Sequence, residues 1–210
     1  MTRALRLALI FSFSLASLAA LAQQDFSGEV VDGKGADNNH RTKIYATKDK
    51  LRFEPQDQSE REHGVMIVDL AKQTSAVLMP ERKMYMVFPS SQSPAAQRTW
   101  HLFRITDAEN ACSEWQKLPH NENGTCKKIG SETVNGRSTV KYEGTNDKGE
   151  TGQVWIDPKI GFPIKWQGKD GGGELQNIKE GSQPSSLFEI PSDYQKFQMP
   201  AGMQNMQRPH

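Results

Sequence analysis

The sequence predicts an α+β domain that is mainly β, in which a curved antiparallel sheet of about eleven strands forms a half-barrel with one or two covering helices. Short runs rich in β-branched, aromatic and Met side chains follow one another, and turn residues such as Gly, Asn, Asp and Pro separate them. One segment between two blocks of such runs has apolar residues at loosely helical spacing. Because the connections are short, neighbouring strands are expected to be antiparallel.

The first block contains six expected strands. They are placed at residues 26–31, 42–47, 50–54, 65–70, 75–79 and 83–88. The runs at 65–68, 76–79 and 84–88 are apolar at almost every position, which indicates a part of the sheet that is covered on both faces. One face would meet the core, and the other a helix or an apolar cavity.

The second block contains five expected strands. They are placed at residues 126–133, 137–144, 152–157, 162–168 and 174–179. Asn135-Gly136, between the first two, is the strongest two-residue hairpin signal. Phe162, Ile164 and Trp166 alternate with polar residues, so one face of their strand is expected to be solvated. The run 170–173 lacks the Lys-Ser/Thr of a phosphate-binding loop and is interpreted as a hairpin turn.

The expected helices lie between the blocks, in residues 94–115. Trp100, Leu102 and Phe103 give this segment more apolar surface than a connector needs. We therefore expect it to cover the sheet.

The first 22 residues have the features of a secretory signal peptide. Arg3 and Arg6 precede an apolar run of roughly 15 residues, which is shorter than the ~20 that a membrane-spanning helix needs. The run ends in a small-residue cleavage signal at Ala22, and the next residue is Gln23 rather than a Cys that could be acylated. We expect cleavage after Ala22, a periplasmic or secreted location and no membrane anchor. The half-barrel domain would then span 23–197 and a disordered tail rich in Met, Gln and Pro 198–210.

The chain has two cysteines, Cys112 and Cys126. In an oxidising compartment such a pair is expected to form a disulfide, and closing a loop of about 15 residues is worth roughly 3 kcal/mol. The alternative is a zinc site that adds His101 and His120, but the wide spacing of the cysteines lacks the close pair of structural zinc sites. The Met residues of the tail have a spacing that could bind Cu(I), which the sequence leaves open.

Composition excludes several classes of function. Loss of Arg3 and Arg6 with the leader lowers the 26 basic residues to 24 against 25 acidic residues, a formal charge of −1. A nearly neutral surface gives no reason to expect nucleic acid or an anionic membrane as partner. The mean hydropathy of −0.70 indicates a lean core. The sequence contains no nucleophile elbow, zinc helix, redox pair or dinucleotide fingerprint, so we expect a protein that is not an enzyme and has no cofactor. We also expect it to be a monomer.

The order of elements, together with the segment Phe-Glu-Ile-Pro-Ser-Asp-Tyr at 188–194, resembles the LolA/LolB-like superfamily of periplasmic lipoprotein carriers, and more closely its uncharacterised branch, a domain of unknown function. The stretches that carry the resemblance are 43–54, 68–74, 83–87, 130–137, 154–157 and 161–165. The chain departs from the true carriers in starting its sheet directly after the leader and in its central cysteine pair. No specific carrier residue is transferred.

The resemblance implies a hydrophobic cavity between the concave sheet and the helices, where understood members of the superfamily hold acyl chains. The residues expected to line it are Met66, Val68, Val77, Met79, Met84, Met86, Trp100 and Phe103. Met adapts to flexible ligands, although each of these side chains could instead fill a core. The expected function is binding of an acyl chain, another apolar ligand or a lipidated partner such as a lipoprotein. The alternative is an envelope assembly or stress factor that binds a protein through its sheet without lipid.

Overall fold

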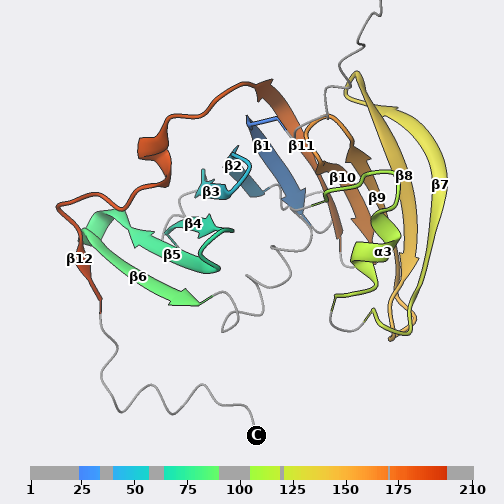
Figure 1. Ribbon diagram of the computed structural model, residues 1–210, viewed down its shortest axis with the longest axis horizontal. Coiled ribbons are helices and arrows are strands. Elements are labelled where there is room, and N and C mark those ends of the chain that lie inside the picture. The colour runs from blue at the N-terminus through green and yellow to red at the C-terminus, as the bar shows by residue number, and fades with distance from the viewer. Residues whose placement is uncertain are drawn as a thin grey trace, which may run out of the picture.

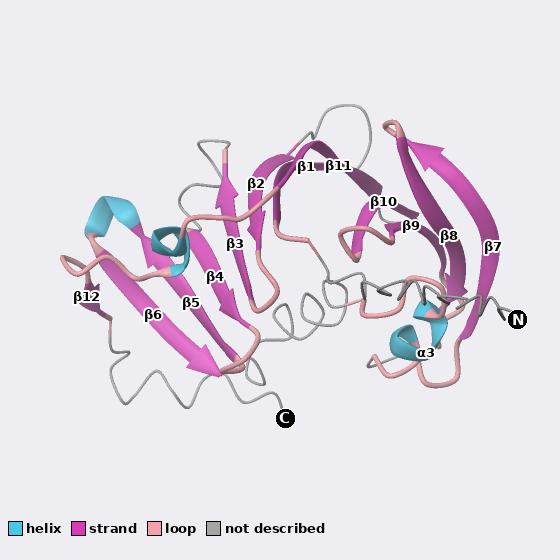
Figure 2. Cartoon of the chain, turned by 45° about the horizontal axis from the view of Figure 1, so that its top comes forward, coloured by secondary structure: helices cyan, strands magenta, loops and turns pink. Residues whose placement is uncertain are grey.

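The computed structural model describes residues 24–33, 40–56, 64–89, 105–118, 121–169 and 171–197. Within these ranges the chain forms one twelve-stranded sheet in the order β12-β6-β5-β4-β3-β2-β1-β11-β10-β9-β8-β7. The sheet is curved into an arch and does not close into a barrel (Figure 2). The expected fold class is confirmed.

The first half of the arch consists of β1 (Phe26–Gly33), β2 (His40–Ala46), β3 (Lys50–Pro55), β4 (Val65–Asp69), β5 (Thr74–Met79) and β6 (Met84–Pro89). The second half consists of β7 (Thr125–Val134), β8 (Arg137–Thr145), β9 (Thr151–Asp157), β10 (Phe162–Gly168) and β11 (Gly171–Glu180). Each half is a meander of sequence neighbours. The two halves are joined by the antiparallel pair of β1 and β11, so the chain runs outward from the middle of the arch on one side and back toward it on the other (Figure 1).

All eleven expected strands are present, with bounds shifted by up to three residues. A twelfth, β12 (Gln195–Lys196), pairs in parallel with β6 and was not predicted, since two residues leave no periodic signal. The expectation that Gly171 to Gly173 form a turn was wrong. Gly168 pairs with Gly171, and the glycines belong to β11.

One face of the sheet can be followed from strand to strand, because residues directly opposite in an antiparallel pair point to the same side. Phe53 of β3 is opposite Met66 of β4, Met66 is opposite Val77 of β5, and Val77 is opposite Met86 of β6. This is the concave face. On it, Phe53 and Met66 pack against the main buried cluster, which includes Phe26, Ile44, Leu51 and Val68.

The convex face of β4 to β6 is covered by the C-terminal segment. The short 3-10 helix η3 (Ser185–Phe188) places Phe188 in a buried cluster with Ile67, Ala76 and Leu78. The Arg52 guanidinium donates a hydrogen bond of 2.7 Å to the Leu187 carbonyl. This part of the sheet was expected to be covered on both faces. On the convex face the cover is the segment that follows residue 184. A second 3-10 turn, η1 (Pro80–Arg82), joins β5 and β6.

Among the described residues of the expected helical segment, α3 (Ala111–Trp115) is the one α-helix, and it lies under the second half of the arch (Figure 2). Cys112 of α3 and Cys126 of β7 form the predicted disulfide, with 5.5 Å between their Cα atoms. The zinc alternative is therefore wrong. Residues 90–104, the expected leader 1–22 and the tail 198–210 lie outside the described residues.

A cluster of ion pairs joins three strands of the second half of the arch. The Arg137 guanidinium pairs with the carboxylate of Asp157, whose side chain is 3% exposed, and with Glu180, so it ties β8 to β9 and β11.

In the part of the chain that the structure describes, no helix combines the length and the apolar character needed to cross a membrane.

Candidate functional site

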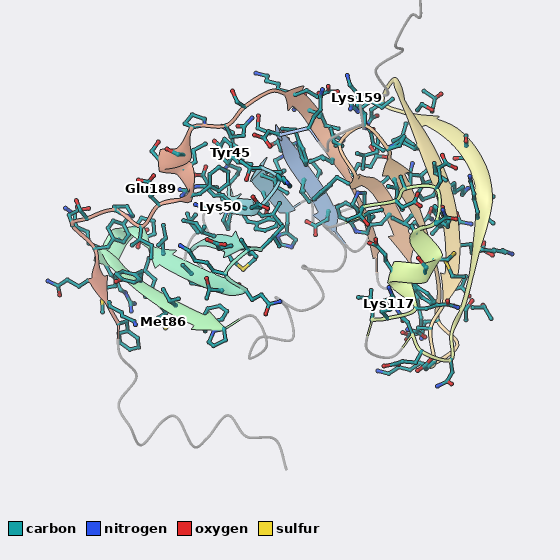
Figure 3. The ribbon with its side chains drawn as sticks, viewed as in Figure 1. Tyr45, Lys50, Met86, Lys117, Lys159 and Glu189 are labelled. Atoms are coloured by element: carbon teal, nitrogen blue, oxygen red, sulfur yellow. A yellow bond between two sulfur atoms is a disulfide. The ribbon has the colours of Figure 1, made fainter. Side chains whose placement is uncertain are left out.

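A cavity of about 580 Å³ lies between the concave face and the α3 segment. The sheet contributes most of its apolar wall, through Val30, Phe53, Val154, Ile156, Phe162 and Pro163. The α3 segment contributes Ile105, Ala111, Trp115 and Leu118. The two arms of the arch are visible in Figure 3, which places Met86 on one arm and Lys117, just after α3, on the other. The cavity walls therefore come from both halves of the sheet and from the α3 segment.

A bulge in β10 determines which residues of that strand face the cavity. The pairing of β10 with β9 shifts between Pro163 and Lys165. Proline has no N–H to donate, which is why it is tolerated at such a break in the ladder. The expectation that Phe162, Ile164 and Trp166 share one face by simple alternation was incomplete. Phe162, Pro163 and Trp166 line the cavity, whereas Ile164 is fully buried in the core.

Two tryptophans of the cavity wall lie against glycines. A Cβ added to Gly144 would come within 3.0 Å of the Trp115 ring, and one added to Gly124 within 2.8 Å. A Cβ added to Gly173 would collide with the Trp166 ring. Each ring thus occupies the space that a side chain would take on the strand beneath it. These glycines give the indoles flat backbone surfaces to lie on.

The α3 segment is held to the sheet at two points besides this packing. The Cys112–Cys126 disulfide joins it to β7. The Tyr142 hydroxyl, on β8, donates a hydrogen bond of 2.9 Å to the Ala108 carbonyl. Burial raises the pKa of Tyr142 and favours the neutral hydroxyl that makes this bond. The wall formed by the helix is therefore fixed in place without a ligand.

The polar residues of the cavity are acidic or neutral. Its lining includes Asp32, Glu114 and Glu150, and among the described residues that line it there is no Lys, Arg or His. Asp32 and Glu150 also line a shallower depression of about 480 Å³, whose other residues include Lys169, Gly171 and Gly172. The two hollows share Trp166. The apolar cavity therefore opens at one end into a polar mouth.

Metal chemistry finds no support in the described part of the chain, where no three His, Cys, Asp or Glu side chains come together in a way that could hold an ion. What the site offers is apolar surface with three acidic side chains in its lining and an adjoining depression in which two of them lie with Lys169.

None of the six predicted lining residues that the structure describes lines this cavity. Val68 is fully buried in the core. The five predicted residues that are half-buried on the concave face of β4 to β6 are Met66, Val77, Met79, Met84 and Met86. We call these five the methionine face. Trp100 and Phe103 lie outside the described residues, so the ligand contacts of all eight stay a prediction.

The sequence reasoning missed the residues of the second block that form the cavity. The only trace of the cavity in the sequence is the presence of Trp115 and Trp166 and of three glycines that the structure brings against their rings, Gly124, Gly144 and Gly173. Nothing local says that a given glycine faces a given tryptophan. That pairing depends on the register of strands far apart along the chain.

No model of a known protein family matches this chain. No curated protein matches it either. Solved structures do. An uncharacterized conserved protein from Thermus thermophilus has a TM-score of 0.54 at 10% identity, over 84% of this chain and 91% of that one. This likeness shows a shared fold.

Two other solved structures are similar at lower scores. MucB in the MucA/MucB complex of Pseudomonas aeruginosa has a TM-score of 0.49 at 14% identity, over 87% of this chain and 63% of that one. A LolA superfamily protein from Nitrosomonas europaea has a TM-score of 0.35 at 9% identity, over 80% and 90%. The superfamily suggested by the sequence is thus found among similar structures. At these scores neither likeness carries an argument about function.

Proposed function

We propose that this protein binds an apolar ligand, an acyl chain or the lipidated end of a partner, in the cavity between α3 and the concave face. The observation that supports it is an apolar hollow of about 580 Å³ with a few polar groups at one end. Binding pockets for small molecules have volumes of roughly 300–1,000 Å³ and are lined mostly by apolar and aromatic side chains. The cavity has both properties.

Its walls are suited to binding because they are already in place. The sheet side rests on fully buried residues such as Phe26 and Phe162. Their rings pack edge to face, with 5.2 Å between the ring centroids. The helix side is held by the disulfide and by the Tyr142 bond. A preformed pocket loses little of the binding free energy to the ordering of side chains.

The methionine face is proposed as a continuation of the same site. Phe53 lines the cavity, and the residue opposite it on the next strand is Met66. A long chain that passes Phe53 would next meet Met66, Val77 and Met86. Met side chains adjust to flexible ligands at small cost.

An exported location is part of the proposal. The disulfide between Cys112 and Cys126 is typical of proteins that fold in an oxidising compartment. The leader read from residues 1–22 points the same way. Mass spectrometry of the secreted or periplasmic protein should find a mature chain that begins at Gln23.

The binding test uses 1-N-phenylnaphthylamine, a neutral fluorescent probe whose emission rises in apolar surroundings. Wild-type protein is expected to bind it saturably. Val154→Asp should abolish binding, because it places a charge on the cavity wall. Ile129→Asp is the matched control, since Ile129 is 46% exposed on β7. Circular dichroism verifies that both variants fold. Absence of saturable binding by the wild type, or equal binding by folded Val154→Asp, would contradict the proposal.

A second pair of variants tests the methionine face. Met86→Asp should weaken displacement of the probe by long-chain ligands more than by short ones. Val87→Asp is the control, because the neighbouring side chain on a strand points to the opposite face and Val87 is 39% exposed. Equal effects of the two substitutions would leave the methionine face out of the site.

An alternative function has one observation in its favour. The ten-residue β7 is the last strand of the sheet, and in the described part of the chain it pairs on one side alone, with β8. An exposed edge of this kind can take up an extended segment of another protein as an added strand. If folded wild-type protein binds no apolar probe, this partner-binding function becomes the better proposal.

A further inference from the structure

We propose that the ligand of this cavity carries a positively charged ammonium head on its apolar chain. The inference rests on the binding function proposed above and adds the chemistry of the head group. It is based on the apolar cavity, the two indoles in its wall and the acidic residues among its lining.

The cavity differs from the rest of the molecule in its charged residues. The whole chain has 26 basic and 25 acidic residues. Among the described residues that line the cavity, however, three are acidic and none is basic. The bias therefore belongs to this place and does not follow from composition. A ligand with a carboxylate or sulfate head would find no cation among the described residues of this wall, and one, the exposed Lys169, in the adjoining depression.

The carboxylates lie where a head group would come to rest. Asp32 and Glu150 line both the apolar cavity and the polar depression that adjoins it. A chain buried among Val154, Ile156 and Phe162 would leave its head at this opening. Glu114 approaches the same cavity from α3.

The contacts of two of these carboxylates are mainly to neutral donors. Glu114 accepts a hydrogen bond of 2.5 Å from the Thr106 hydroxyl. Glu150 accepts one of 3.1 Å from the Asn146 amide. The exception is Lys169, which also lines the depression and whose ammonium is 3.7 Å from Glu150; its side chain is 73% exposed, so solvent screens this pair. Neutral donors leave the negative charge in place for a ligand.

The tryptophans favour the same head. The face of an indole attracts cations through its negative ring charge, and quaternary ammonium groups are bound in this way. Trp166 lines both the cavity and the depression, and Glu150 belongs to both linings as well. Aromatic faces together with carboxylates suit an ammonium head and oppose an anionic one.

The test compares three amphiphiles with the same twelve-carbon chain, each below its micelle concentration. Dodecyltrimethylammonium, dodecyl maltoside and dodecanoate displace 1-N-phenylnaphthylamine from the mature protein. The cation is expected to bind at least about tenfold more tightly than dodecanoate, with the neutral maltoside between them, and salt should reduce the difference.

The variant Glu114→Gln/Glu150→Gln should lose most of the preference for the cation over the maltoside and over dodecanoate. Glu81→Gln/Glu189→Gln is the matched control, since it removes the same charge from two exposed residues, one between β5 and β6 and one just after η3, that do not line the cavity (Figure 3 labels Glu189). It should keep the preference.

The outcomes separate the two proposals. If the three amphiphiles bind equally, or dodecanoate binds best, the head-group inference is overturned and the apolar pocket stands. A preference that survives in the Glu114/Glu150 variant also overturns it. If neither the probe nor any amphiphile binds, the pocket itself is rejected, and the inference with it.

Discussion

Substitution of Gly173 by alanine is expected to displace Trp166 from the cavity wall. A Cβ at residue 173 would collide with the Trp166 ring and come within 2.7 Å of the Asp32 Cβ. Neither atom belongs to the far end of a flexible side chain. Both Trp166 and Asp32 line the cavity, whereas Gly173 does not. A methyl group at residue 173 would therefore change the proposed site by displacing these two side chains.

The cost can be worked out in two ways that agree. If the ring stays, one extra methyl in a packed contact costs about 1–3 kcal/mol. If the ring turns out instead, it loses about half of the roughly 200 Å² that a tryptophan buries, which at about 25 cal/mol per Å² is about 2.5 kcal/mol. We therefore expect the free energy of unfolding to fall by about 1–3 kcal/mol.

Guanidinium denaturation measures this change, and probe titration measures the affinity of the cavity, which should fall with the movement of the ring. Gly168→Ala is the control on the same hairpin, since the nearest atom to its added Cβ is the Gly171 carbonyl oxygen at 4.0 Å. It should stay within about 0.5 kcal/mol of the wild type. If Gly173→Ala unfolds and binds like Gly168→Ala, Trp166 does not lie on Gly173.

The remaining predictions concern what holds the arch together. Replacing Cys112 and Cys126 by alanine should lower the free energy of unfolding by about 3 kcal/mol, because the bond closes a loop of about 15 residues; denaturation curves that coincide with those of the wild type would refute it. Arg137→Met should cost about 3–5 kcal/mol by leaving the buried Asp157 carboxylate without its guanidinium, and a thermal midpoint equal to that of the wild type would contradict this. Hydrogen bonds from Lys159 and then Arg137 hold the pKa of Glu180 below its usual value of 4.5. Its stabilising effect is therefore present at neutral pH and is lost as the pH falls from about 4.5 through the folded-state pKa. Glu180→Gln should make unfolding less dependent on pH in that range, whereas an acid-denaturation curve as steep as that of the wild type would argue against the role of this carboxylate.

Local features of the sequence were sufficient for the strands and most turns. Asn135-Gly136 predicted a hairpin, and in the structure both residues have positive φ, 49° and 76°, as a two-residue turn between β7 and β8 requires. The disulfide was predictable as well, because the chain has two cysteines and each has one possible partner. In these cases the information lies within a few residues or in a single pair.

The cavity could not be placed in this way. Alternation along a strand reports which side chains are buried, and it predicted an apolar face where the methionine face lies. It does not report which strands meet, and the cavity depends on the pairing of β1 with β11 and on the bulge in β10.

The sequence by itself determined the strands, their turns and the covalent link, since these depend on backbone preferences and patterns between near neighbours. The tertiary structure alone decided that Trp115 and Trp166 lie on glycines of other elements and that Asp32, Glu114 and Glu150 line one cavity. Contacts between residues far apart along the chain, such as Asp32 and Gly173, are set by the register of the whole sheet. No local pattern encodes that register.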